Sequence, residues 1–101
     1  MKLYEKQVEK MLVDACRHNK IYEHKGFPQI KGYPDRVIYN HKINEIHFVE
    51  IKNETYYGQT ENQKKWQKII ENAGGKYFLI NGEKEMKEYI KKYIESEEGD
   101  K

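Results

Sequence analysis

The sequence predicts a single α/β domain whose helices and strands follow the order αβββαβα. One observation is the apolar spacing near the N-terminus, where Val8, Leu12 and Cys16 recur at the four-residue interval of one helix face. A second is a set of short runs rich in β-branched and aromatic residues, which are typical of strands. A third is Ala73-Gly74-Gly75, which ends a lysine-rich helical segment directly before another such run.

Each element follows from these patterns. We expect a helix over residues 4–19, strands over 21–24, 34–39 and 46–52, a helix over 60–72, a strand over 76–80 and a helix over 83–94. A chain of 101 residues has room for one hydrophobic core. We therefore assign residues 1–94 to one domain and interpret 95–101 as a polar tail.

Composition excludes several classes of protein. The net charge is only +2, so a local basic face, not the overall charge, must attract nucleic acid. The single cysteine, Cys16, leaves no disulfide, and the four histidines lack metal-ligand spacing, so we place them on the surface or in turns. Without a signal core or an apolar run of membrane length, the protein is expected in the cytoplasm.

The run from Ile46 to Lys52 carries the first chemical signal. In a strand, alternate side chains share a face, so Ile46, Phe48, Glu50 and Lys52 point to one side. A carboxylate and an ammonium on an otherwise apolar strand are costly unless they meet partners or a metal.

The second signal is Pro34-Asp35, which begins the strand before it. If residues 40–42 form a tight turn, the two strands make an antiparallel hairpin, and Asp35 lies beside Glu50. A Pro-Asp pair alone is usually just a turn. The matching Glu50-Ile51-Lys52 favours a site instead.

These residues suit metal-dependent hydrolysis of a phosphodiester. Mg²⁺ and Mn²⁺ prefer oxygen ligands, which Asp35, Glu50 and the Ile51 carbonyl offer. A bound cation lowers the pKa of water, and the Lys52 ammonium orients that water or stabilises developing negative charge.

Three motifs together resemble a known family. Gly32-Tyr33-Pro34-Asp35, then Phe48-Val49-Glu50-Ile51-Lys52, then Thr60-Glu61-Asn62-Gln63 is similar to the virus-type replication-repair nuclease (VRR-NUC) domain of the PD-(D/E)XK superfamily, over roughly residues 5–80. The resemblance implies a central mixed four-stranded sheet flanked by helices. It also implies a Mg²⁺- or Mn²⁺-dependent endodeoxyribonuclease that acts in DNA repair or recombination.

The resemblance also adds two helical residues to the site. Thr60 and Gln63 have the spacing of a capping box, and the resemblance implies that Gln63 also reaches Lys52, the metal-bound water or a phosphate. A first-helix glutamate often completes the acidic pocket in such nucleases. We prefer Glu9 for this position as a metal ligand, with Glu5 as the substitute.

DNA contacts are expected from basic residues around the site. The candidates are Lys31 and Arg36 near the Pro-Asp loop and Lys64 and Lys65 after Gln63, with Lys25 and Lys68 beside them. Tyr33, Tyr56 and Tyr57 either stack on bases or pack within their loops.

Small stand-alone proteins of this kind resemble junction-resolving enzymes, which suggests a homodimer that cuts four-way (Holliday) junctions and a phage origin, hence the host cytoplasm. Met86, Tyr89, Ile90 and Tyr93 offer an apolar interface unless they only cover the sheet. The alternatives are a monomeric endonuclease that nicks flaps or duplex, and a module that binds branched DNA without cutting.

Overall fold

A computed structural model describes residues 4–53 and 58–96 of the chain. Its elements are α1 (Glu5–His18), β1 (Tyr22–Lys25), β2 (Arg36–Asn40), β3 (Glu45–Lys52), α2 (Glu61–Asn72), β4 (Lys76–Asn81), α3 (Gly82–Tyr89) and a π-helical turn, η1 (Ile90–Ile94). The expected order αβββαβα is confirmed. No helix in these residues is long and apolar enough to span a membrane.

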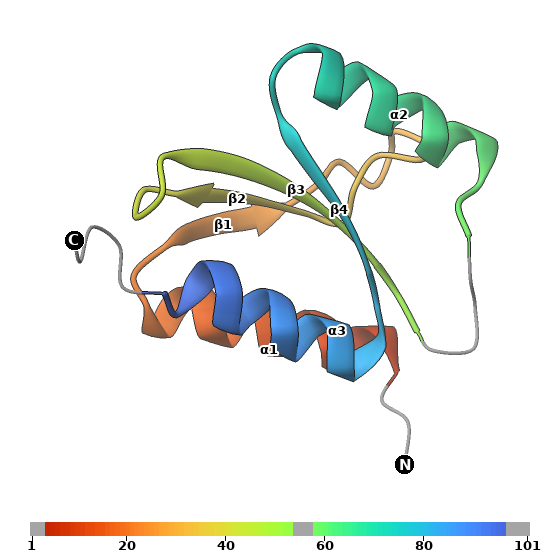
Figure 1. Cartoon of the computed structure of the whole chain (residues 1–101). Coiled ribbons are helices and arrows are strands. Elements are labelled where there is room, and N and C mark those ends of the chain that lie inside the picture. The colour runs from red at the N-terminus through yellow and green to blue at the C-terminus, as the bar shows by residue number, and fades with distance from the viewer. Residues whose placement is uncertain (1–3, 54–57, 97–101) are drawn as a thin grey trace.

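The four strands form one mixed sheet in the order β1-β2-β3-β4. The pairs β1–β2 and β2–β3 are antiparallel, whereas β3 and β4 run parallel. A parallel pair needs a crossover connection, and α2 provides it above the sheet, while α1 and α3 cover the opposite face (Figure 1). The sheet is therefore the predicted one.

Side chains along β3 alternate between the two faces of the sheet, which places the core residues on one face and the candidate site residues on the other. Val49 and Ile51 are buried in the core, which joins α1, α3 and the lower face of the sheet. Leu12, Cys16, Ile38, Met86 and Ile94 complete the centre of that core. Glu50 and Lys52 alternate with Val49 and Ile51, so they point to the other face, toward the α2 side.

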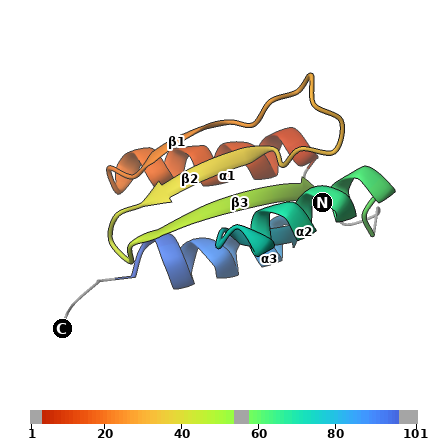
Figure 2. The same ribbon diagram turned by 90° about the horizontal axis from the view of Figure 1, so that it is seen from above.

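The C-terminal helix differs from the prediction. It was expected to continue to residue 94, but the α-helix ends at Tyr89 and a π-helical turn follows, in which Glu95 N donates to the Ile90 carbonyl over 2.9 Å. The β2–β3 hairpin holds this end: Asn40 Nδ2 donates to the Tyr93 carbonyl (3.0 Å) and Lys42 Nζ to the Ile94 carbonyl (3.1 Å). Figure 2 shows the hairpin turn beside η1.

The apolar residues of this helix cover the sheet. Met86, Tyr89 and Ile90 are buried and Tyr93 is partly buried against the core. Their use as a dimer interface was therefore a wrong expectation, because the side chains that would make it already fill the space under β3 and β4.

His47 also departs from expectation. It is completely buried, with Nδ1 2.6 Å from the Tyr89 hydroxyl and Nε2 2.7 Å from Glu45 Oε1. Phe78 and Tyr93 pack against the ring. Since both ring nitrogens are hydrogen-bonded, this histidine is a satisfied core residue and not a surface group.

The loop before β2 approaches the start of α2 closely at one glycine. Gly32 has φ +85°, and a Cβ added there would lie 2.5 Å from the backbone carbonyl carbon of Asn62. Only glycine combines that backbone conformation with such proximity. The loop that carries Pro34 and Asp35 is therefore packed directly against the helix that carries Gln63.

Gly32→Ala is expected to destabilise the protein more than Gly74→Ala. Gly74 also has positive φ (+94°) but open space around its Cβ position, so its substitution measures backbone strain alone, about 1–2 kcal/mol. The clash at Gly32 should add about 1–3 kcal/mol. Thermal unfolding of both variants measures the difference, and equal losses would mean that the loop moves away from α2 freely.

Candidate active site

The two carboxylates predicted to converge do lie opposite each other. Arg36 pairs with Val49 in the β2–β3 ladder, so Asp35, one residue earlier, lies across from Glu50, one residue later. The Asp35 Oδ2 atom accepts a hydrogen bond from the Ile51 backbone N–H over 2.7 Å. Both carboxylates line a pocket of about 380 Å³ beneath the loop that precedes β2.

Burial makes the charge on Glu50 unfavourable. The residue is only 4% exposed, and this desolvation, together with the charge of Asp35, raises its pKa to about 8. The neighbouring Asp35 carboxyl group raises that pKa further, because it can share a proton held by Glu50. Burial likewise raises the pKa of Asp35, while the Ile51 N–H and the Lys52 charge oppose the rise.

The pair has the donor chemistry of a divalent-cation site. Glu50 Oε1 is buried and has no hydrogen-bond partner among the described residues. An unpaired buried carboxylate oxygen beside a second carboxylate is a costly arrangement that a hard cation would relieve. No group of three or more Asp, Glu, His or Cys side chains in the described part of the chain is arranged as a metal site. The residues fit Mg²⁺ or Mn²⁺ held by two carboxylates and completed by other oxygens.

Lys52 lies on the same face of β3 as Glu50 and is 6% exposed. Its positive charge lowers the pKa of both Asp35 and Glu50, against the effect of burial. The ammonium is therefore near both carboxyl groups, as the sequence predicted.

Gln63 performs two functions with one amide. Its Oε1 accepts from the Thr60 backbone N–H (2.9 Å) and Thr60 Oγ1 accepts from Gln63 N (3.1 Å), which completes the capping box of α2. Its Nε2 donates to Glu50 Oε2 over 2.8 Å. The capping box is confirmed, and the partner that the structure gives Gln63 in the site is the Glu50 carboxylate. The expected contact with Lys52, the metal-bound water or a phosphate remains a prediction.

Substitutions at Thr60 and Gln63 should separate stability from activity. Thr60→Ala removes one capping bond and should cost about 1 kcal/mol of unfolding free energy with little effect on activity. Gln63→Ala should cost a similar amount of stability but also lower activity by about 10- to 100-fold, because Glu50 loses its orienting partner. Thermal melts and initial rates distinguish them, and equal activities would assign Gln63 to capping alone.

The first-helix glutamates take different positions around Asp35. Glu9 lines the pocket, but its Oε2 accepts from Arg36 Nε over 2.7 Å. The charges of both Glu9 and Glu5 raise the pKa of Asp35, so each is electrostatically close. Glu9 as a metal ligand, with Glu5 as the substitute, remains a prediction.

Arg36 does not lie on an open basic face. It alternates with Asp35 and therefore points to the α1 side of the sheet, where Nη1 also donates to Glu23 Oε1 over 2.7 Å. Its side chain is only 15% exposed. Arg36 therefore pairs with both Glu9 and Glu23. The expected contact between Arg36 and DNA would require these ion pairs to break.

The other predicted DNA contacts surround the pocket. Lys31 lines it, together with Lys25. Lys64 and Lys65 are exposed on α2, and Lys64 Nζ is 3.7 Å from Glu61 Oε2. Tyr56 and Tyr57 lie outside the described residues.

Tyr33 packs within its loop. Its ring centroid is 5.1 Å from that of Phe27 and 5.1 Å from that of Trp66 on α2. These contacts bear out the loop-packing alternative for Tyr33 and join the loop to the helix.

Sequence reasoning missed Asn81. It ends β4 and pairs with Lys52 in the parallel ladder, so the two side chains share a face. Asparagine usually caps a helix with its side chain, but here the amide makes no capping bond, and Asn81 Oδ1 is buried without a partner among the described residues. The only sequence signal was an Asn-Gly pair after a strand, which reads as an ordinary turn.

Comparisons with known proteins agree with this geometry. No family model and no curated protein matches the chain. Among solved structures, the chain is similar to a "VRR_NUC domain protein", with a TM-score of 0.72 and 21% sequence identity over 93% of this chain and 90% of that one. The chain therefore has the fold of a VRR_NUC domain protein, which confirms at the level of fold the resemblance carried by its three motifs.

Proposed function

We propose that the protein is a divalent-metal-dependent endonuclease that hydrolyses phosphodiester bonds in DNA. The observation that carries this proposal is the convergence of the buried Glu50 carboxylate and the half-buried Asp35 carboxylate, with Lys52 on the same sheet face. The fold shared with a protein described as a VRR_NUC domain protein supports it. Perturbed carboxyl pKa values in a pocket are also typical of catalytic sites.

Each residue has a defined task in the proposed reaction. Asp35 and Glu50 would hold Mg²⁺ or Mn²⁺, with the Ile51 carbonyl and Glu9 as the further expected ligands. The bound cation would lower the pKa of the attacking water and neutralise charge on the phosphoryl oxygens. Lys52 donates hydrogen bonds that orient the water or stabilise the charge that develops in the transition state. Gln63 keeps Glu50 oriented through the bond to its Oε2.

Branched DNA is the proposed substrate. Lys25 and Lys31 line the pocket, and exposed lysines follow along α2, which suits a local contact with phosphates beside the site. Paired cuts in a four-way junction require two active sites, so this form of the proposal includes a homodimer. The C-terminal helix is not available for it, whereas Tyr22, Tyr39 and Ile46 are exposed apolar residues on the other face of the sheet.

The test is incubation of the protein with end-labelled four-way junction, flap and linear duplex in Mg²⁺, Mn²⁺ or chelator. Asp35→Asn should be inactive, and Lys10→Met, on the exposed surface of α1, should retain wild-type activity. Symmetric paired cuts together with a dimer in sedimentation would support the resolvase. Cleavage of flap or duplex by a monomer would assign a single-site endonuclease, and binding without cleavage would reduce the protein to a DNA-binding module.

A further inference from the structure

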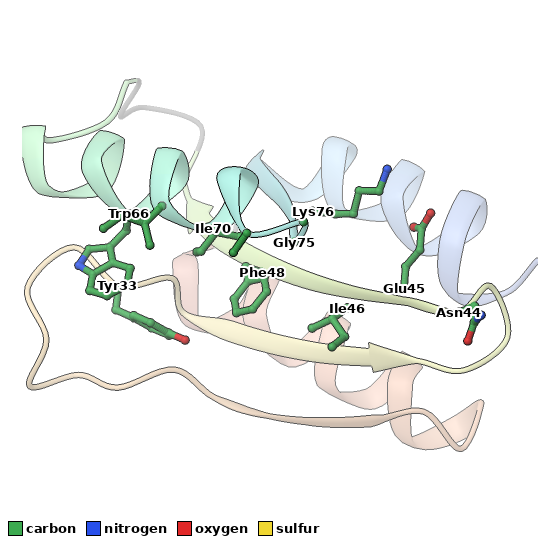
Figure 3. Close-up of a pocket in the computed structure, with 12 residues that line it drawn as sticks. Tyr33, Asn44, Glu45, Ile46, Phe48, Trp66, Ile70, Gly75 and Lys76 are labelled. Atoms are coloured by element: carbon green, nitrogen blue, oxygen red, sulfur yellow. The ribbon is translucent and has the colours of Figure 1, made fainter.

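A second, apolar groove lies between α2 and the sheet. It has a volume of about 580 Å³ and three aromatic walls, Tyr33, Phe48 and Trp66. Ile46, Ile69 and Ile70 add aliphatic surface, with Asn44, Glu45 and Lys76 at the far end. Figure 3 shows Trp66 and Tyr33 at one end, Asn44 and Glu45 at the other, and Phe48 and Ile46 between them. Its volume is in the range of small-molecule sites.

The groove adjoins the pocket of the candidate active site. Tyr33 lines both the groove and the pocket that contains Asp35 and Glu50. Phe48 precedes Glu50 by two residues on the same face of β3, which separates them by about 7 Å along the strand. A group bound in the groove would therefore lie directly beside the phosphate that is cut.

The lining suits a flat aromatic group attached to an anionic chain. Aromatic side chains bind nucleobases by stacking, whatever the base. Lys76 lines the groove, and Lys65 is exposed on α2 one turn before Ile69 at its rim. The one carboxylate in the lining, Glu45, is hydrogen-bonded to His47. This charge distribution favours nucleic acid over a purely apolar partner.

We infer that the groove binds one unpaired nucleobase of the DNA next to the scissile phosphate. This inference rests on the proposed nuclease function and narrows its substrate to DNA that has an unpaired base at the cut, as at a flap or a branch point. A base stacked within intact duplex cannot enter the groove without leaving the stack, and that cost is smallest where pairing is already lost.

Trp66 makes the inference directly measurable, because it is the only tryptophan in the chain and lines the groove. The experiment titrates the protein in chelator with a flap DNA, and with the same DNA in which single unpaired nucleotides at the branch are made abasic in turn. Anisotropy of labelled DNA measures binding separately. We expect quenching of Trp66 by the complete flap, and loss of the quenching with about tenfold weaker binding for one abasic position.

Two variants complete the test. Ile69→Glu places a charge at the exposed rim of the groove and should reproduce the effect of the abasic flap. Lys87→Met makes the same change of net charge on α3, which covers the opposite face of the sheet, at a side chain that is 66% exposed and outside the groove, and should bind as wild type does.

Four outcomes would overturn the inference. Equal quenching and equal affinity for complete and abasic flaps would show that no nucleobase binds in the groove. A Trp66 spectrum that depends on protein concentration without DNA would place a second copy there. Absence of any DNA binding would overturn both this inference and the proposed function, whereas metal-dependent cleavage with no base dependence would overturn the inference alone.

Discussion

Glu50→Gln is expected to abolish metal-dependent cleavage and, at alkaline pH, to make the metal-free protein more stable than wild type. The amide keeps an oxygen to accept from Gln63 and replaces the buried, unpaired Glu50 Oε1 with an N–H group. The substitution removes the charge that burial opposes and also removes a ligand from the proposed cation. Activity should fall about 10³-fold or more, because the variant loses both a metal ligand and the positioning of the reacting groups by the bound metal.

The pH dependence of this effect has a defined sign. The pKa of Glu50 in the folded protein, about 8, lies above its ordinary value of 4.5. The free energy of unfolding therefore carries no penalty from Glu50 below about pH 4.5, where the residue is protonated in both states. Stability is lost as the pH rises through about 8. The loss at pH 9 should be on the order of several kcal/mol in wild type, shared with Asp35, and absent in Glu50→Gln.

Thermal unfolding in chelator between pH 5 and pH 9 measures this directly. Glu50→Gln should melt about 8 °C or more above wild type at pH 9 and within a few degrees of it at pH 5. Glu61→Gln, on an exposed glutamate of α2, controls for the loss of one negative charge. A Glu50→Gln protein that is less stable than wild type across the range would show that the carboxylate contributes to folding and is not strained.

Lys52→Met should reduce cleavage by about 10²- to 10⁴-fold through two effects that pH separates. The Lys52 charge lowers the pKa of Asp35 and Glu50, so without it both carboxyls keep their protons to higher pH. Metal binding should then be weaker than wild type near pH 6.5. This difference should shrink toward pH 9 as the carboxyls ionise, and the cation then no longer meets a neighbouring ammonium.

Calorimetric titration with Mn²⁺ from pH 6.5 to pH 9, beside cleavage rates at saturating metal, tests both effects. Lys10→Met again serves as the surface control. If saturating metal at pH 9 restores cleavage to Lys52→Met, then Lys52 acts only on the carboxyl pKa values and has no direct role toward water or phosphate.

Local sequence patterns were sufficient for the fold and for the centre of the site. The alternation along residues 46–52 fixed the face of Glu50 and Lys52, and the hairpin register placed Asp35 opposite Glu50. Both depend on the period of a strand and on one turn. The mixed sheet came from the resemblance of three motifs, and the structural likeness agrees with it.

Other features depend on contacts between segments distant in sequence. The bridge from Arg36 to Glu9 and Glu23 joins α1, β1 and β2. The carbonyls of Tyr93 and Ile94 in η1 are held by Asn40 and Lys42, more than fifty positions earlier in the chain. The groove exists only because α2 crosses above the sheet. No periodicity within one segment reports such contacts.

The β2–β3 register has a consequence for the turn at the far end of the hairpin. The turn of residues 41–44 lies about 17 Å from the carboxylates, given the five residues of β2 at about 3.3 Å each. A slip of one residue in that turn would carry either Asp35 or Glu50 to the opposite face of the sheet. Insertions or deletions in this turn are therefore expected to impair catalysis without touching the pocket, and natural variation in its length should be limited to changes that preserve the pairing of Arg36 with Val49.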